Sequence, residues 1–102
     1  MPDKTVIESK LEAVKLSLRI SYNRYDSELL DLINAAVLDL GVAGVVLSYD
    51  LDSLVTMAIK TYCKMNFGLP EDYDRLKRSY DEQKAQLSNT TGYTNWKGAK
   101  NV

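Results

Sequence analysis

The stretch that decides the fold is LVTMAIKTYCKM, residues 54–65. Apolar side chains recur through it at helical spacing, namely Leu54, Val55, Ala58, Ile59, Tyr62, Cys63 and Met65. Because so wide an apolar face needs several neighbours to cover it, the stretch predicts a central, buried helix. We expect this helix to be capped by Asp50 or Asp52 and to stop at Gly68.

Three further helices are expected around this central one. A first helix near residues 5–17 is predicted by apolar residues in helical steps that start at Ile7. A second helix is expected to have Asp26 as its N-cap and Gly41 at its left-handed C-cap position. The fourth helix, with Pro70 at its first position, has only a thin apolar stripe and extends to Leu87.

Two segments lack a clear helical pattern. Residues 41–49, GVAGVVLSY, allow a short strand, an extra helical turn or an apolar loop, since two glycines in four residues disfavour a long regular element. Residues 88–102 lack helical periodicity, so we expect a flexible C-terminal tail after a helical domain that spans residues 1–87. The predicted fold class is all-α, a small bundle of about four helices with this tail.

The composition disfavours catalysis. The 102 residues include no histidine and one cysteine, Cys63. Histidine is the usual proton-transfer group near neutral pH, a zinc site needs about four ligands, and a catalytic thiol needs a base. We therefore expect no enzyme, no catalytic, metal or cofactor-binding residues and no cofactor, with Cys63 a small buried hydrophobe. Without an apolar run of ~20 residues or a signal peptide, we expect no membrane association.

The charged residues are unevenly distributed, although 13 basic residues nearly balance 14 acidic ones. Between Tyr25 and Ile59 every charged residue is acidic, namely Asp26, Glu28, Asp31, Asp39, Asp50 and Asp52. Helix capping accounts for the acids at helix starts, and a divalent-ion site is the alternative. Because DNA-binding domains carry clustered basic residues, sequence-specific DNA binding is disfavoured.

Two aromatic residues stand out in the expected tail, Tyr93 and Trp96, with Lys97 beside them. Exposed indole gains nothing in water, and tryptophan and tyrosine are enriched among residues that dominate interfaces. The two rings either bury against a partner when the tail orders on binding, or fold back over the thin stripe of the fourth helix.

Two quoted segments resemble a known family. The turn LRI at 18–20, a short polar loop and then DSELLDLINAA at 26–36 look like the opening of the small head-tail connector proteins of tailed phages and prophages. In that family a Leu-Arg-Ile turn precedes an acidic loop and a helix of the form Asp-x-x-Leu-x-x-x-Ile-x-x-Ala. The segment LVTMAIKTY at 54–62 resembles the family's central helix, which ends in a tyrosine. The likeness covers about residues 5–87.

The resemblance implies a structural head completion protein. Such an adaptor assembles as a ring under the portal after DNA packaging, extends the DNA channel and provides the docking surface for the stopper and tail. Twelvefold symmetry would follow from the portal, and the genome would pass through without sequence-specific binding. The expected location is the head-tail interface of the virion, and the host cytoplasm during assembly. In this setting Tyr93, Trp96 and Lys97 would bind the portal, and the six acids would line the channel or the subunit interface.

A small helical DNA-binding regulator is the alternative. Such a protein needs a recognition helix rich in basic and amide side chains, and only the fourth helix qualifies, with Arg75, Lys77, Arg78, Gln83, Lys84 and Gln86. The acids of the same helix, namely Asp72, Asp74, Asp81 and Glu82, would repel phosphates.

Overall fold

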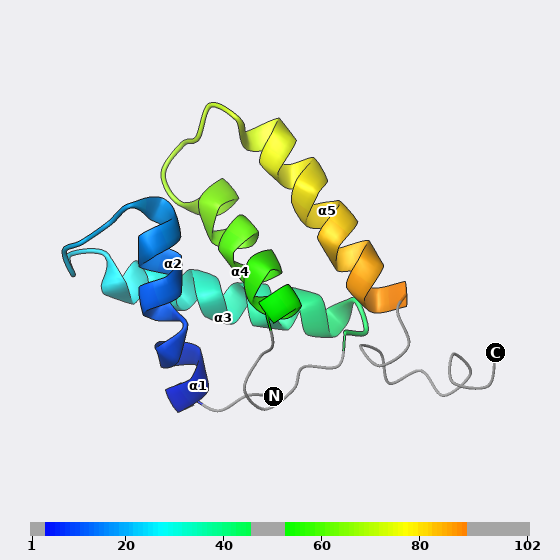
Figure 1. Ribbon diagram of the computed structural model, residues 1–102, viewed down its shortest axis with the longest axis horizontal. Helices are drawn as coiled ribbons and strands as arrows, with labels where there is room; N and C mark the ends of the chain where they lie inside the picture. The colour runs from blue at the N-terminus through cyan, green and yellow to red at the C-terminus, as the bar shows by residue number, and fades with distance from the viewer. Residues whose placement is uncertain (1–3, 46–52, 90–102) are drawn as a thin grey trace.

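The computed structural model describes residues 4–45 and 53–89, and its regular elements are all helices (Figure 1). They are α1 (Lys4–Ser9), α2 (Leu11–Leu18), α3 (Asp26–Val42), α4 (Ser53–Asn66) and α5 (Tyr73–Asn89). The all-α class is therefore confirmed. The helix expected near residues 5–17 is divided at Lys10 into α1 and α2. Most of the expected tail, from residue 90 onward, lies outside the described residues.

Helix α4 is the centre of the bundle, as predicted. It packs against α2, α3 and α5. In Figure 1, α3 crosses behind α2 and α4, while α4 and α5 run in opposite directions and are joined by the loop at the top. The α4 side chains that are buried are Val55, Ala58, Ile59, Cys63 and Met65. Helix α4 ends at Asn66, and Gly68 takes the left-handed φ of +70° expected near the stop.

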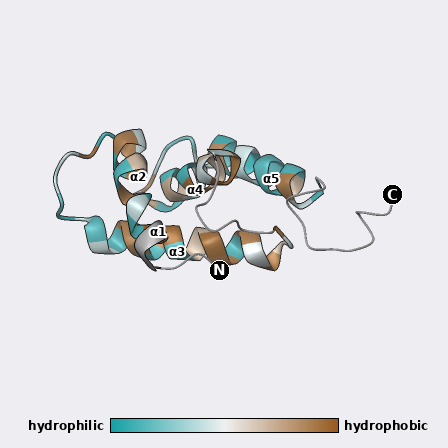
Figure 2. Ribbon diagram, turned by 60° about the horizontal axis from the view of Figure 1, so that its bottom comes forward, coloured by the Kyte–Doolittle hydropathy of each residue, from teal (hydrophilic) through white to brown (hydrophobic). Residues whose placement is uncertain are grey.

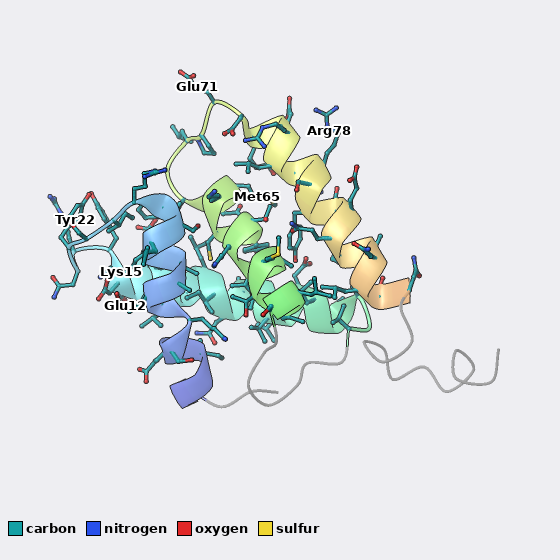
Figure 3. All side chains as sticks on the ribbon, viewed as in Figure 1. Glu12, Lys15, Tyr22, Met65, Glu71 and Arg78 are labelled. Atoms are coloured by element: carbon teal, nitrogen blue, oxygen red, sulfur yellow. The ribbon has the colours of Figure 1, made fainter. Side chains whose placement is uncertain are left out.

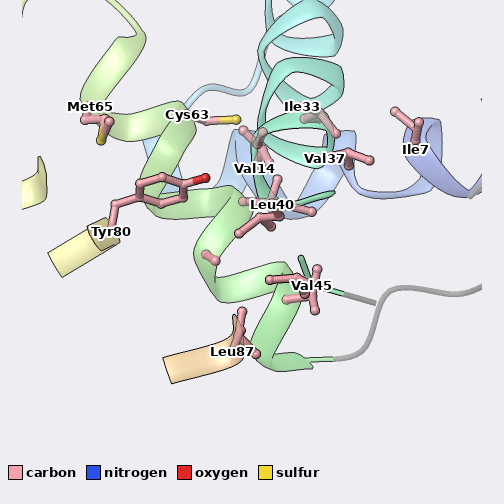
Figure 4. Packing of buried hydrophobic residues seen from close by; sticks show 14 of the residues in the cluster. Ile7, Val14, Ile33, Val37, Leu40, Val45, Cys63, Met65, Tyr80 and Leu87 are labelled. Carbon is pink, nitrogen blue, oxygen red and sulfur yellow. The ribbon is translucent and has the colours of Figure 1, made fainter. Parts of the chain in front are cut away.

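One continuous apolar core joins all five helices. Its largest fully buried side chain is Tyr80 of α5, which is 1% exposed. Figure 4 shows the Tyr80 ring reaching from α5 across α4. The ring meets that of Tyr62 edge-on, with 5.3 Å between the centroids, a favourable geometry for aromatic pairs. The rest of α5 is mostly hydrophilic (Figure 2), so this helix buries only a narrow stripe.

The start of α3 differs from the prediction. Its N-cap is Tyr25, which makes no side-chain cap hydrogen bond, and Asp26 is the first helical residue. The Asp26 carboxylate instead forms an ion pair with Lys15 of α2, at 2.9 Å between Nζ and Oδ1. A tertiary ion pair has thus replaced the expected local cap. The acid still lies in the first turn, where the helix dipole favours negative charge.

The end of α3 also differs, because the helix continues through Gly41 to Val42. The residue with positive φ is Gly44, at +93°. The Gly44 N–H donates to the Gly41 carbonyl and the Val45 N–H to the Leu40 carbonyl, both at 3.0 Å, which is the Schellman pattern of helix termination. The part of residues 41–49 that the structure describes is therefore a helix end and its cap.

Helix α5 begins at Tyr73, three residues after Pro70. Pro70 was predicted at the first helical position, and that prediction is wrong. The Leu76 N–H donates to the Asp72 carbonyl at 3.0 Å, so the first helical hydrogen bond starts from Asp72. At the other end α5 extends to Asn89, two residues beyond the expected limit.

Helix α2 ends with an arginine in a conformation that favours glycine. Arg19 has φ 59° and ψ 41°. The Arg19 N–H donates to the Leu16 carbonyl at 3.1 Å, and the Ile20 N–H donates to the Lys15 carbonyl at 2.9 Å. This is a second Schellman cap, formed by the Leu18–Ile20 turn, and its left-handed residue carries a Cβ that disfavours the conformation.

We predict that Arg19→Gly is more stable than Arg19→Ala by about 1 kcal/mol, because only glycine adopts this φ without steric cost. Both substitutions remove the same charged side chain, so the difference between them isolates the backbone term. Urea unfolding followed by circular dichroism measures it. Equal midpoints for the two variants would contradict the left-handed assignment.

Candidate functional site

The acids of the middle of the chain do not form one group. Asp26 pairs with Lys15 across the α2–α3 contact. Glu28 and Asp31 are exposed and make no ion pair with any described residue. They share one helical stripe with Leu38 and Val42, which are also exposed. We call these four residues the α3 outer face. It is acidic toward the start of α3 and apolar toward the end.

Asp39 turns toward α5 and joins a polar cluster at the edge of the core. The Tyr80 hydroxyl donates to Asp39 Oδ2 at 2.6 Å, and Lys84 Nζ donates to the same oxygen at 3.1 Å. Lys84 Nζ also lies 5.2 Å from the centroid of the Tyr80 ring. Partial burial raises the pKa of Asp39, but the hydrogen bonds from Tyr80 and Lys84 outweigh it and leave the pKa below its usual value. This cluster ties α3 to α5.

The other five predicted site residues lie in two segments outside the part of the chain that the structure describes. Asp50 and Asp52 lie outside the described residues, as do Tyr93, Trp96 and Lys97. Their assignments as channel or interface acids and as portal-binding residues therefore stay predictions.

The cations of α5 are largely neutralised by acids. Arg75 pairs with Asp72, and Lys77 pairs with Asp81 at 2.7 Å. Lys84 pairs with Asp39 at 3.1 Å. Arg78 has no ion pair with any described residue, and Figure 3 shows it projecting away from the bundle. Helix α5 therefore does not present a row of free basic side chains.

An open cleft of about 310 Å³ lies where α2 ends, α4 ends and α5 begins. Three cations line it, namely Arg19, Lys64 and Arg75, together with one acid, Asp72. Phe67 and Leu76 supply apolar wall. We call it the basic cleft. The sequence analysis missed it because its three cations come from different elements, although the quoted Leu18–Ile20 turn carries one of them.

Two exposed leucines are sequence neighbours of residues that line the basic cleft. Leu69 is 99% exposed and sits in the sequence between Phe67 and Pro70, two residues that line the cleft. Leu16, next to the lining residue Ser17, is also exposed. An isolated exposed leucine is ordinary, but two next in the sequence to residues of one charged cleft favour a surface suited to contact with another protein.

The thiol of Cys63 is buried, as predicted. Burial raises its pKa to about 12, which disfavours the reactive thiolate. Within residues 4–45 and 53–89, no group of three or more His, Cys, Asp and Glu side chains is placed to hold a metal ion. No helix in the same ranges is both long and apolar enough to cross a bilayer.

Residues 11–94 match a family model described as phage connector protein. The match includes α2 to α5, hence the basic cleft, the α3 outer face and the Asp39 cluster. Comparison with curated proteins and with solved structures gives no match.

We predict that Asp39→Asn reduces the loss of stability in acid. Because the pKa of Asp39 in the folded chain lies below its usual 3.8, its carboxylate stabilises the fold above that value, and the contribution disappears as pH falls through the folded pKa. The wild type should therefore exceed Asp39→Asn in unfolding free energy near pH 7, and the two should converge as the pH falls from 3.8 through the folded pKa.

Urea unfolding over this pH range measures the difference. Asp31→Asn is the matched control, since Asp31 is an exposed acid on the same helix with no ion pair to a described residue. A pH-independent gap between wild type and Asp39→Asn would show that the carboxylate charge is not what stabilises the cluster.

Proposed function

The chain belongs to the phage connector protein family, and from this membership we propose that it is a head-tail adaptor that assembles as a ring under the portal. The family is one of structural phage proteins, and it gives the chain a head-tail connector role in association with other head and tail proteins. The observation that carries the proposal is the match over residues 11–94, which takes in four of the five helices. The earlier resemblance to this family is thereby confirmed.

The proposed adaptor acts after DNA packaging. It extends the DNA channel below the portal and provides the docking surface for the stopper and tail. The number of adaptor subunits in the ring follows the symmetry of the portal, so the proposed ring is twelvefold. The proposed location is the head-tail interface of the virion, reached from the host cytoplasm.

Ring assembly needs two different, complementary surfaces on each subunit, because contacts that close a ring are head-to-tail. The chain has an acidic and apolar surface on α3 and a basic one at the cleft. These supply the two kinds of surface that the proposal requires. Acids that remain free in the ring would keep DNA from binding to the channel wall, since like charges repel and no phosphate is neutralised.

The charge pairs of α5 disfavour the alternative, a DNA-binding regulator. Four cations of α5 would contact DNA in such a protein. Three of them, Arg75, Lys77 and Lys84, are already paired with carboxylates. Binding phosphates would require these pairs to break. The family match contains no indication of a regulator.

Electron microscopy of negatively stained complexes tests the function. The protein is mixed with portal rings, or with DNA-filled capsids that lack tails, from a matching phage. We expect an extra annulus below the portal, whose symmetry can be counted directly. Bare portals at saturating protein would overturn the adaptor proposal.

We predict that Trp96→Ala weakens portal binding by on the order of 2 kcal/mol, about thirtyfold in Kd, without changing the melting temperature. A buried indole at an interface accounts for a loss of this size. Titration of portal rings with labelled protein measures the Kd. Tyr22→Ala, an exposed aromatic in the described residues, is the control and should leave the Kd unchanged. If Trp96→Ala binds as tightly as wild type, Trp96 is not a portal anchor.

A further inference from the structure

The basic cleft and the α3 outer face are complementary in charge and hydropathy, and we infer that the cleft of one copy of the chain receives the α3 outer face of the next copy. The inference rests on the proposed ring assembly and names the surfaces that would make it. The two surfaces belong to different helices, so the contact is head-to-tail. In a linear assembly that has not closed, one cleft remains free at one end and one α3 outer face at the other.

Charge is the first argument. The cleft holds three cations and one acid, so its lining carries an excess of positive charge. Asp72 pairs with Arg75, and neither Arg19 nor Lys64 has a carboxylate within ion-pair distance among the described residues, although Lys64 acts on Asp72 at longer range. The α3 outer face has two exposed carboxylates that make no ion pair with a described residue, Glu28 and Asp31. Opposite charges that are free on both surfaces favour their encounter and set its orientation.

Apolar contact is the second argument. Val42 is 88% exposed at the far end of the α3 outer face, and Leu38 is exposed one turn before it. Leu69 and Leu16 are also exposed, and each is next in the sequence to a residue that lines the cleft. Interfaces combine a desolvated apolar part with a polar rim, and each of the two surfaces provides both. Glu28 and Val42 are fourteen positions apart, about 21 Å along a helix, so the α3 outer face is a long strip with its charged part and its apolar part at opposite ends.

A second copy fits the cleft better than nucleic acid does. Asp72 lies among the cations and would face a phosphate backbone. Duplex binding also draws on many basic contacts along a track, whereas three cations at one end of the bundle provide only a few. A protein surface with two carboxylates and an apolar end matches the mixture of cationic and apolar residues in the cleft lining.

Two charge-reversed variants test the inference. Arg19→Glu/Lys64→Glu makes the cleft acidic, and Glu28→Lys/Asp31→Lys makes the α3 outer face basic. In each variant the two surfaces carry the same sign of charge, so each alone should self-associate at least about tenfold more weakly than wild type. When the two variants are mixed in equal amounts, the cleft of each variant has a charge opposite to the α3 outer face of the other. Association should therefore return, in assemblies in which the two variants alternate.

Sedimentation equilibrium up to about 1 mM protein detects association as weak as roughly 4 kcal/mol. Arg78→Glu and Glu82→Lys are matched controls, because they reverse exposed charges on α5 that do not line the cleft. Both should associate like wild type. Thermal unfolding of each variant confirms that it folds, and the neutral Arg19→Gln/Lys64→Gln replaces the cleft variant if that variant does not.

Loss in each variant alone and recovery in the mixture would support the inference. Equal association of wild type and both variants would overturn it, while leaving ring assembly by other surfaces in place. A wild type that stays monomeric to 1 mM would also overturn it, and the annulus at the portal would then decide the proposed function separately. If the cleft variant lost affinity for duplex DNA and kept self-association, the cleft would be assigned to phosphates instead.

Discussion

The need to cover α4 on several sides shapes the whole bundle. Its apolar residues are spread over more than one face, and α2, α3 and α5 each bury a stripe against it. No single neighbour could remove this much apolar surface from water, and burial of apolar area is the main favourable term in folding. The partners of α4 are left with their other faces toward solvent, and those faces are where the chain can meet other proteins.

Periodicity in the sequence predicted which segments are helices, but not where each one ends. Hydrophobic spacing reflects burial, and burial is what stabilises these helices. The ends depend on contacts that the local sequence does not reveal. Asp26 was a suitable N-cap, yet Lys15 of another helix engages it. Gly41 was a suitable C-cap, yet the Schellman turn forms three residues later at Gly44, where the buried Val45 can pack.

The candidate surfaces were harder to predict than the fold. The sequence grouped the acids because they are neighbours along the chain, whereas the structure divides Asp39 from Glu28 and Asp31. Asp39 contacts Tyr80, 41 positions away, and no local pattern indicates such a pair. The basic cleft draws Arg19, Lys64 and Arg75 from three separate elements, so only the packed bundle brings them together. The resemblance predicted the family correctly, but it predicted none of these contacts.

Helix α5 is attached along one side. Its buried side chains are Leu76, Tyr80 and Leu87, it packs mainly on α4, and the Asp39 cluster gives it a tie to α3. Detaching α5 alone would expose these three side chains and the side of α4 that they cover, while α1 to α4 stay packed, so it costs less free energy than global unfolding. Amide protons of α5 can therefore exchange with solvent through this partial opening, whereas those of α4 are protected until the bundle itself comes apart.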